Sequence, residues 1–305
     1  MNNWNRVEIP DLTGKEVIVT GANSGIGFQA AKAFASKGAE TILACRNETK
    51  ALIAVQQIHK KFPDSSAKFI PLDLASLTSI HRFADQLRKE YTRLDILLNN
   101  AGIILNPYSQ TEDGFESHMG INHLGHFALT GLLLDLISAT QGARVINVSS
   151  KIYRKGTMDF DPVHSTSPEG YSRFKAYTSS KLANLLFTYE LDRRLQQENI
   201  KAKSVAVHPG YSYTDFGRGS LARALKYIFY PLVITITQSP ARGALPSLRA
   251  AVDPEVRGGD FYGPGGWREI KGYPVKVRSN GASHDTKDAR LLWEISEQLT
   301  GIKYL

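Results

Sequence analysis

Residues 16–27 read Glu-Val-Ile-Val-Thr-Gly-Ala-Asn-Ser-Gly-Ile-Gly, an apolar run that ends in a glycine-rich turn. Ile26, Ala30 and Phe34 follow at helical spacing, so the segment predicts a strand that leads directly into a helix. A tight turn, a close backbone approach and helix N–H groups facing the anion are what a dinucleotide pyrophosphate requires. The spacing is G-x-x-x-G-x-G rather than the common G-x-G-x-x-G. The residues expected to bind the cofactor in this turn are Gly21, Asn23, Ser24, Gly25, Ile26 and Gly27.

Short apolar runs recur along the chain, with helical patterns between them. The runs are apolar throughout rather than alternating, which is typical of strands buried on both faces. They occupy 16–20, 41–45, 68–72, 94–98, 144–148 and 203–207, and 261–263 is expected to add a last short strand. Strands that alternate with helices predict an α/β fold, a Rossmann-type doubly wound parallel sheet with helices on both faces.

No linker or internal repeat divides the chain, so we expect residues 1–305 to form a single dinucleotide-binding and catalytic domain. The main helices are expected at 115–137 and 176–195, and further helical patterns cover 240–252 and the tail. Pro246 is awkward within the third of these, because proline disrupts a helix interior.

The bulk composition excludes several classes of protein. The chain has 305 residues, of which 42% are apolar and 22% charged, as is ordinary for a soluble globular protein. The net charge is +8, but the basic residues are scattered without a run beyond a pair, which argues against a nucleic-acid partner. The single cysteine, Cys45, excludes an internal disulfide and a multi-cysteine metal site. We find no signal peptide and no stretch long enough to span a bilayer, so we expect a cytoplasmic protein without a transmembrane segment.

Arg46 and Asn47 follow the second predicted strand, at the position that distinguishes the two nicotinamide cofactors. An acidic residue there would accept from the ribose 2′-hydroxyl of NAD, whereas an arginine accommodates the 2′-phosphate of NADP. Glu48 lies beyond the strand end, so we expect NADP(H) to be preferred over NAD(H). The alternative is that Arg46 only caps the strand at the surface. Residues expected in the same crevice, at the ends of the third and fourth strands, are Asp73, Leu74, Asn99, Ala101 and Gly102.

Tyr177 and Lys181 are four residues apart in a predicted helix, so their side chains share one face. A phenol has a pKa of about 10, and a nearby ammonium favours the phenolate and lowers that pKa. The pair therefore predicts a proton donor and acceptor that works near neutral pH. A Tyr-x-x-x-Lys spacing alone is weak, but here it follows the glycine-rich turn, Asn-Asn-Ala-Gly at 99–102 and the Ser-Ser pair at 149–150, in order.

Taken together, these motifs resemble the short-chain dehydrogenase/reductase superfamily over nearly the whole chain. They are Thr-Gly-Ala-Asn-Ser-Gly-Ile-Gly at 20–27, Asp73-Leu74, Asn-Asn-Ala-Gly at 99–102, Asn122, Ser150, Tyr-Thr-Ser-Ser-Lys at 177–181 and His-Pro-Gly at 208–210. The phrases Ala44-Cys45-Arg46, the stretch 118–127 and Ser-Lys-Leu-Ala-Asn at 180–184 are similar to the retinol dehydrogenase-like branch.

The resemblance implies a role for each matching residue. Tyr177 would be the general acid/base, Lys181 its pKa-lowering partner and ribose ligand, and Ser150 rather than Ser149 the hydroxyl that holds the substrate oxygen. Asn122 would hold a water that links Lys181 to solvent. The residues implied in the loop that closes over the nicotinamide are Pro209, Gly210 and Thr214.

Several other features of the sequence allow competing interpretations. His118, His123 and His126 do not share one helix face, and no carboxylate or cysteine completes a set, so no metal site is expected. The 151–176 stretch is either a specificity loop or a surface insertion. Residues 211–236 predict a substrate loop or lid, although its apolar part at 227–236 also suits a core helix or a membrane contact.

The sequence thus predicts an NADP(H)-dependent oxidoreductase that acts on an apolar aldehyde, ketone or secondary alcohol. The competing class is a non-catalytic NADP(H)-binding sensor or scaffold on the same fold, and such proteins usually lose the tyrosine or lysine that this chain keeps. Members of the superfamily often pair their two long helices across subunits, which implies a homodimer or homotetramer.

Overall fold

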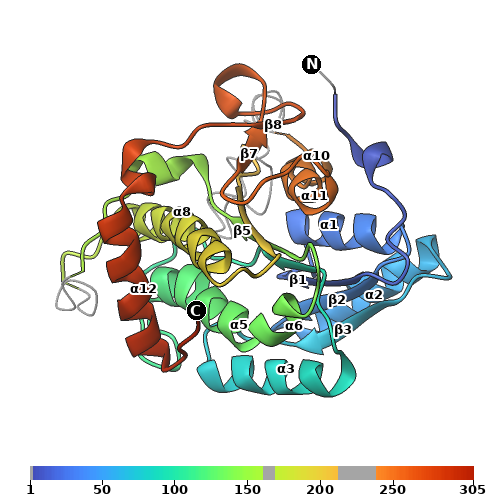
Figure 1. Cartoon of the computed structure of the whole chain (residues 1–305), viewed down its shortest axis with the longest axis horizontal. Coiled ribbons are helices and arrows are strands. Elements are labelled where there is room, and N and C mark those ends of the chain that lie inside the picture. Colours follow the sequence, from blue (N-terminus) through green and yellow to red (C-terminus); the bar gives the residue numbers. More distant parts are fainter. Residues whose placement is uncertain (1–2, 161–168, 212–237) are drawn as a thin grey trace, which may run out of the picture.

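The computed structural model describes residues 3–160, 169–211 and 238–305, and its strands form one sheet (Figure 1). The sheet has eight strands in the order β3-β2-β1-β4-β5-β6-β7-β8. Strands β1 to β7 pair in parallel and β8 pairs antiparallel with β7. The bounds are β1 Glu16–Thr20, β2 Glu40–Cys45, β3 Ala67–Pro71, β4 Ile96–Asn99, β5 Arg144–Val148, β6 Lys203–Val207, β7 Phe261–Pro264 and β8 Pro274–Lys276.

The predicted parallel sheet is confirmed, with boundaries that shift by one or two residues. The short edge strand β8 was missed. It is three residues long and begins with a proline, which a sheet edge tolerates, and such a run carries no apolar periodicity.

Helices cover both faces of the sheet, as expected for a doubly wound fold (Figure 1). Val17 and Val19 of β1 pack with α1, α2 and α11, whereas Ile18 packs on the opposite face with α3, α5 and α8. Successive side chains of one strand are therefore buried on opposite sides, which explains why the strands are apolar throughout. The bounds on the first face are α1 Gly25–Ala35, α2 Glu48–Lys61, α10 Pro240–Gly243 and α11 Leu245–Val252; on the second they are α3 Leu77–Glu90, α5 Gly125–Leu132, α6 Leu134–Ser138, α8 Arg173–Gln197 and α12 Thr286–Thr300.

The long helix predicted at 115–137 is interrupted in the structure. It begins as α4, Ser117–Met119, widens into the π-helical segment η2, Gly120–Leu124, continues as α5 and breaks again at Leu133 before α6. Glycines flank the wide turn, and the Cα of Gly125 lies so close to the Leu74 carbonyl that a Cβ would come within 2.6 Å of its oxygen. Single π turns of this kind occur frequently at functional sites.

The helical pattern at 240–252 also divides into two. Helix α11 begins at Leu245, so Pro246 lies in its first turn, where a missing N–H leaves no intrahelical bond unmade. Pro246, which the sequence places inside a predicted helix, therefore lies at the start of a helix in the structure. The remaining short helices are η1 Arg6–Glu8, η3 Lys151–Lys155, η4 Trp267–Glu269 and η5 Gly281–His284.

Helix α12 and the tail cover the outer side of α5 and α8 (Figure 1). The Trp293 ring lies 5.1 Å from Phe127 of α5, 5.9 Å from Phe187 of α8 and 4.8 Å from Tyr304 in the tail, measured between centroids. With α12 on one side and the sheet on the other, every residue of α8 from 180 to 192 is buried. This packing fixes the helix that carries Tyr177 and Lys181.

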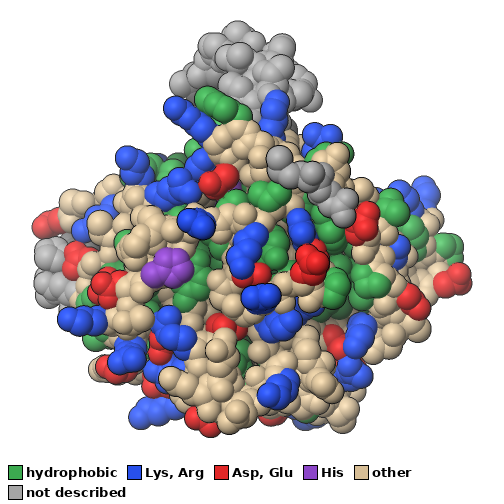
Figure 2. Space-filling model, turned by 45° about the horizontal axis from the view of Figure 1, so that its top comes forward, with side chains coloured by type: hydrophobic (Ala, Val, Ile, Leu, Met, Phe, Trp, Pro, Cys, Tyr) green, Lys and Arg blue, Asp and Glu red, His purple; other side chains and the backbone are tan. Residues whose placement is uncertain are grey.

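None of the helices in the described ranges combines the length and apolar character needed to cross a membrane. Lys and Arg side chains are spread widely over the face shown in Figure 2, with acidic and apolar side chains among them.

Candidate active site

The carboxyl ends of β1, β2, β4, β5 and β6 meet at one edge of the sheet and surround a cavity of about 670 Å³. This is the point at which the strand order reverses between β1 and β4, where ligands bind in open α/β sheets. The volume lies within the usual range of small-molecule sites. The predicted site residues that line the cavity are Gly21, Asn23, Ser24, Gly25, Ile26, Gly27, Arg46, Asn47, Asp73, Leu74, Ala101, Gly102, Ser150, Tyr177, Lys181, Pro209 and Gly210.

The glycine-rich turn has the backbone conformation that its sequence predicts. Gly21 and Gly25 have φ angles of 65° and 58°, which favour glycine. A Cβ on Gly27 would come within 2.5 Å of the Asn100 Nδ2 and 2.6 Å of the Gly21 oxygen, so α1 packs directly against the turn. Ser24 precedes α1 without a side-chain cap, and the N–H groups of the helix start therefore face the cavity unclaimed by a cap.

Arg46 and Asp73 lie side by side at the far end of the cavity. The Arg46 side chain is 72% exposed, and its Nη1 is 3.7 Å from the Asp73 Oδ2. Asn47 accepts a hydrogen bond from the Lys50 N–H at 2.9 Å and so caps α2. Lys50 also lines the cavity and was missed by sequence reasoning. The available signal was its place in the first turn of the helix that follows Arg46.

Asn99 does not reach the cavity, contrary to expectation. Its side chain is 2% exposed and donates to Asn147 at 2.9 Å and to Thr130 at 3.2 Å. Asn100 lines the cavity instead, with its Nδ2 donating to the Thr20 carbonyl at 2.8 Å. The alternation of side chains along β4 is the reason, because it turns Asn99 towards the helices on one face.

The cavity also brings together the three predicted catalytic side chains of Ser150, Tyr177 and Lys181. The Ser150 and Tyr177 side chains both line the cavity, and the Ser150 hydroxyl acts to lower the pKa of Tyr177. The Lys181 Nζ donates to the Val148 carbonyl at the end of β5, at 3.1 Å. Ser149 is committed elsewhere, since its Oγ donates to the Lys181 carbonyl at 2.7 Å. The structure therefore favours Ser150 over Ser149, as the sequence suggested.

Burial dominates the titration of both groups. It raises the pKa of Tyr177, and the neighbouring Ser150 hydroxyl offsets this only in part. It lowers the pKa of Lys181 from 10.5 to about 8. Desolvation therefore sets the direction of the Tyr177 pKa here, and a lowering of that pKa by Lys181 stays a prediction.

Asn122 lies in the π-helical segment beside the cavity rather than on its lining. Its Oδ1 accepts from the Ile103 N–H at 2.8 Å, and its Nδ2 donates to the Ile103 carbonyl at 3.1 Å and to the Ser180 Oγ at 2.9 Å. A Cβ on Gly102 would lie 2.9 Å from the Asn122 Oδ1 and 3.5 Å from the Lys181 Nζ, so the three residues are neighbours. Asn122 thus ties the segment after β4 to the helix of Tyr177 and Lys181.

Buried histidines support the loops around the cavity. His208 donates from Nε2 to Glu269 at 3.1 Å, while its Nδ1 accepts from the Gly210 N–H at 3.3 Å. His126 accepts at Nε2 from the Thr20 hydroxyl at 2.9 Å, and the same hydroxyl accepts from the N–H groups of Asn100 and Ala101. Thr20 and His126 were missed as site-supporting residues, because nothing in their spacing connects β1 with α5.

The three histidines that tempt a metal interpretation have different partners. His118 contacts Glu116, His123 contacts Ser296 and His126 contacts Thr20. Within residues 3–160, 169–211 and 238–305 we find no cluster of three or more histidine, cysteine or acidic side chains able to hold a metal ion. Thr214 and the predicted substrate loop or lid at 211–236, apart from residue 211 itself, lie outside the described residues.

Known proteins share both the sequence and the fold. A family model described as short chain dehydrogenase matches residues 15–223. Human retinol dehydrogenase 14 is 38% identical over 307 residues, covering 95% of this chain and 88% of that protein. Human retinol dehydrogenase 12 is 40% identical over 296 residues, covering 96% of this chain and 88% of that protein.

Solved structures agree with these relatives. An uncharacterized protein from Mycobacterium Paratuberculosis is 36% identical with a TM-score of 0.82, and the match covers 99% of each chain. A short chain dehydrogenase from Salmonella enterica is 26% identical with a TM-score of 0.64, covering 83% of this chain and 97% of that one. The family match, the relatives and the site geometry lead to one conclusion: the chain belongs to the short-chain dehydrogenase family, as a retinol dehydrogenase-like oxidoreductase.

Proposed function

We propose that the protein is an NADP(H)-dependent oxidoreductase that transfers a hydride between the nicotinamide and an apolar aldehyde, ketone or secondary alcohol. The observation that carries this proposal is that Ser150, Tyr177 and the buried Lys181 line the same cavity as the glycine-rich turn. Proton-transfer groups and a phosphate-binding turn in one cavity suit a dinucleotide-dependent redox reaction.

The residues present fit a dinucleotide. The absence of a Cβ at Gly21 and Gly27 leaves the backbone open to a pyrophosphate, which would accept from the N–H groups at the start of α1. Arg46 and Lys50 would bind the 2′-phosphate, and Asp73 would accept from the adenine amino group. This cationic pair is the basis for preferring NADP(H) over NAD(H).

Three side chains would take part in the proton transfer that accompanies the hydride transfer. A bound reduced nicotinamide would supply the hydride. Tyr177 would donate its hydroxyl proton to the substrate oxygen, and the raised pKa keeps that proton in place at neutral pH. Ser150 would hold the same oxygen through its hydroxyl. Lys181, when charged, would stabilise the phenolate that the proton transfer leaves.

Asn122 would act indirectly, without contacting the substrate. Its side chain holds Ile103 and Ser180 in place, and a water beside it would link Lys181 to solvent. Thr214, with Pro209 and Gly210, would complete the loop over the nicotinamide. A homodimer or homotetramer and a cytoplasmic location remain predictions from the sequence.

An apolar substrate is supported by an apolar wall of aliphatic side chains in the cavity lining. Ile103, Ile104, Leu105 and Ile152 line the cavity near Tyr177, and Ile104 is 45% exposed. Exposed aliphatic side chains in a cleft favour an apolar ligand. The names of the relatives make retinaldehyde a reasonable member of the first substrate panel.

The direct test is oxidation of NADPH and of NADH, followed by absorbance, with retinaldehyde, straight-chain aldehydes and aromatic ketones as substrates. Turnover with NADPH that disappears in Tyr177→Phe would support the reductase. Tight NADPH binding without turnover of any substrate in a broad panel would favour the sensor or scaffold. Failure to bind NADPH would overturn the cofactor assignment.

A further inference from the structure

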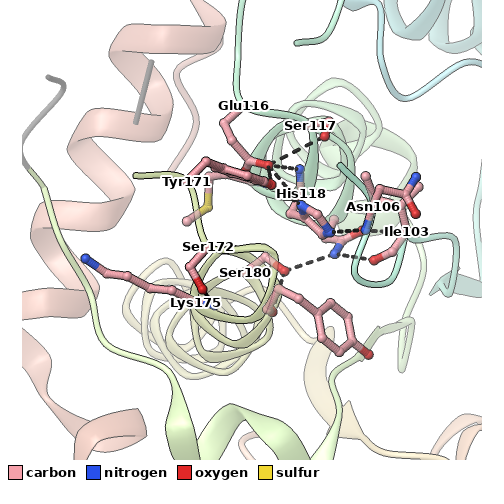
Figure 3. Close-up of polar contacts among 12 residues, drawn as sticks. Ile103, Asn106, Glu116, Ser117, His118, Tyr171, Ser172, Lys175 and Ser180 are labelled. Carbon is pink, nitrogen blue, oxygen red and sulfur yellow. Dashed lines mark hydrogen bonds and ion pairs between the residues drawn. The ribbon is translucent and has the colours of Figure 1, made fainter. Parts of the chain in front are cut away.

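Apart from the groups assigned to catalysis, one buried carboxylate joins segments that border the cavity (Figure 3). Glu116 is 8% exposed, and its Oε1 accepts from the Tyr171 hydroxyl at 2.6 Å and from the His118 backbone N–H at 2.9 Å. Its Oε2 accepts from the Met119 N–H at 2.9 Å. Burial alone would raise the pKa of Glu116, but these donors outweigh it and keep the pKa below its usual value. The carboxylate is therefore ionised and fully used as an acceptor.

Glu116 also fixes the orientation of the His118 ring, which is completely buried. Nδ1 lies 2.9 Å from the Glu116 Oε1 and 2.8 Å from the Tyr171 hydroxyl, while Nε2 lies 3.2 Å from the Asn106 backbone nitrogen. A backbone N–H can only donate, so Nε2 must be the acceptor and Nδ1 must carry the proton. The carboxylate on Nδ1 favours that tautomer, and the ring then holds Asn106.

The residue before Asn106 explains why such a hold is needed. Leu105 has a φ of 52°, a left-handed conformation that costs about 1–3 kcal/mol for a residue with a side chain. Strain of this kind persists only where the surroundings impose it. Asn122 holds the segment at Ile103 and His118 holds it at Asn106, so Ile104 and Leu105 are presented to the cavity between two fixed points.

The same carboxylate reaches the start of the catalytic helix. Tyr171 immediately precedes Ser172, whose hydroxyl accepts from the Lys175 N–H and caps α8. The His118 ring lies 6.2 Å from the Tyr177 ring between centroids. One cluster thus connects the apolar wall with the helix that carries the proton donor.

We propose that Glu116 and His118 are positioning residues that set the shape of the apolar wall at 103–105 and thereby the size of substrate that the enzyme prefers. Neither residue contacts the reacting atoms, and both act through Asn106 and Tyr171. The proposal rests on the proposed reductase activity for its kinetic consequence, but its structural consequence can be measured without turnover.

The test compares Glu116→Gln with the unaltered protein. The glutamine side chain places an NH₂ donor where the carboxylate of Glu116 accepts from the surrounding N–H and O–H groups. The His118 ring then loses its preferred tautomer, and the Asn106 N–H loses the Nε2 atom that accepts its hydrogen bond. Hydrogen–deuterium exchange should accelerate at 103–108 and 169–172 and stay unchanged in the sheet. With NADPH as the reductant, the ratio of kcat/KM for dodecanal to that for butanal should change by about tenfold or more, while the KM for NADPH stays within about twofold.

Two further variants separate positioning from general damage. Glu190→Gln removes another buried carboxylate, which pairs with Arg193 and Arg194 on α8, and should change neither the exchange at 103–108 nor the aldehyde ratio. Tyr171→Phe keeps the bond between His118 and Asn106, so exchange should accelerate at 169–172 but not at 103–108.

Unchanged exchange at 103–108 in Glu116→Gln would overturn the proposal, as would an equal change of the aldehyde ratio in Glu190→Gln. If the unaltered protein reduces none of the aldehydes or retinaldehyde, the proposed activity fails, and the exchange experiment alone decides the structural inference.

Discussion

Burial acts on Tyr177 and Lys181 in opposite directions, yet it favours the neutral form of both. The pKa of Tyr177 is raised and that of Lys181 is lowered to about 8. At neutral pH the phenol keeps its proton and the ammonium is still mostly charged. This state is ready to give a proton to a carbonyl oxygen and to stabilise the resulting phenolate, so the site suits reduction near neutrality.

Replacing Tyr177 by phenylalanine should remove the proton donor with almost no change of shape. We expect kcat to fall by about 10²–10⁴ while the Kd for NADPH is retained. Stopped-flow turnover and fluorescence titration of NADPH measure the two quantities. Tyr189→Phe is the matched control, since Tyr189 lies on the same helix with its hydroxyl 2.8 Å from Ser279, and it should keep full turnover. Comparable losses in both variants would contradict the assignment.

Replacing Lys181 by methionine should abolish turnover and stabilise the fold. The folded pKa of about 8 lies below the ordinary 10.5, so the unfolded state binds more protons between these values and the free energy of unfolding rises with pH there. Below that window the cost of burying the charge is complete, about 3 kcal/mol. Val148 keeps a donor in the variant, because Asn184 also reaches its carbonyl at 3.1 Å.

Urea unfolding measures this effect. The stabilisation of Lys181→Met should be largest at neutral pH and should shrink as the pH rises through the window above 8. A variant that is less stable than the unaltered protein at neutral pH would show that the buried ammonium is compensated.

Arg46 and Lys50 should decide the choice of cofactor. Each charge-assisted bond to a 2′-phosphate is worth about 1.5–3 kcal/mol, so Arg46→Ala should raise the KM for NADPH by about tenfold to a hundredfold and leave that for NADH nearly unchanged. Lys50→Ala should act in the same direction with a smaller effect, because Lys50 lies a turn further from the strand end. Equal effects on both cofactors would support the alternative that Arg46 is only a surface cap.

At the scale of elements, the contact between α1 and the turns after β1 and β4 should be intolerant of added volume. Gly27→Ala would place a methyl group 2.5 Å from the Asn100 Nδ2, so the helix start must move away from the turn. We expect a loss of stability of about 1–3 kcal/mol and much weaker NADPH binding. Gly281→Ala is the control, since a Cβ there meets nothing within 4 Å. Thermal unfolding with and without NADPH compares the two variants.

Most of the fold could be predicted from the sequence, because parallel strands buried on both faces are uniformly apolar and the helices between them are amphipathic. Six strands, the glycine-rich turn and the order of the motifs were sufficient for the doubly wound sheet. The cavity brings together Tyr177 and Lys181, which their spacing already paired, and Ser150, which the family resemblance implied.

The remaining features depend on contacts between distant residues. The π-helical segment at 120–124 is held by the bonds of Asn122 to Ile103 and Ser180, which no local pattern encodes. Whether the Asn99 side chain points into the protein interior or into the cavity depends on where β4 ends. Whether the pKa of Tyr177 is raised or lowered depends on its burial. The nearby charge of Lys181 can be inferred from the sequence, whereas the desolvation of Tyr177 cannot.

At the scale of the whole molecule, the cavity is bounded by segments that span most of the chain. The glycine-rich turn begins near residue 21, whereas Glu269 reaches His208 from the far end of the sequence. The catalytic helix is likewise held by C-terminal residues, through the Trp293 contacts with Phe127 and Phe187. Loosening the C-terminal packing should therefore affect catalysis as well as stability.

The position of α12 has a consequence for assembly. The sequence predicted that two copies would pair through their long helices, but α12 lies over α5 and α8, and residues 180–192 of α8 have no exposed side left. We therefore expect that any dimer found by size-exclusion chromatography with light scattering does not pair through these helices. A dimer protected from exchange along α8 would contradict this expectation. The fifteen residues of α12 pack on α8 within the same chain, so the buried stretch of α8 already has an intramolecular neighbour.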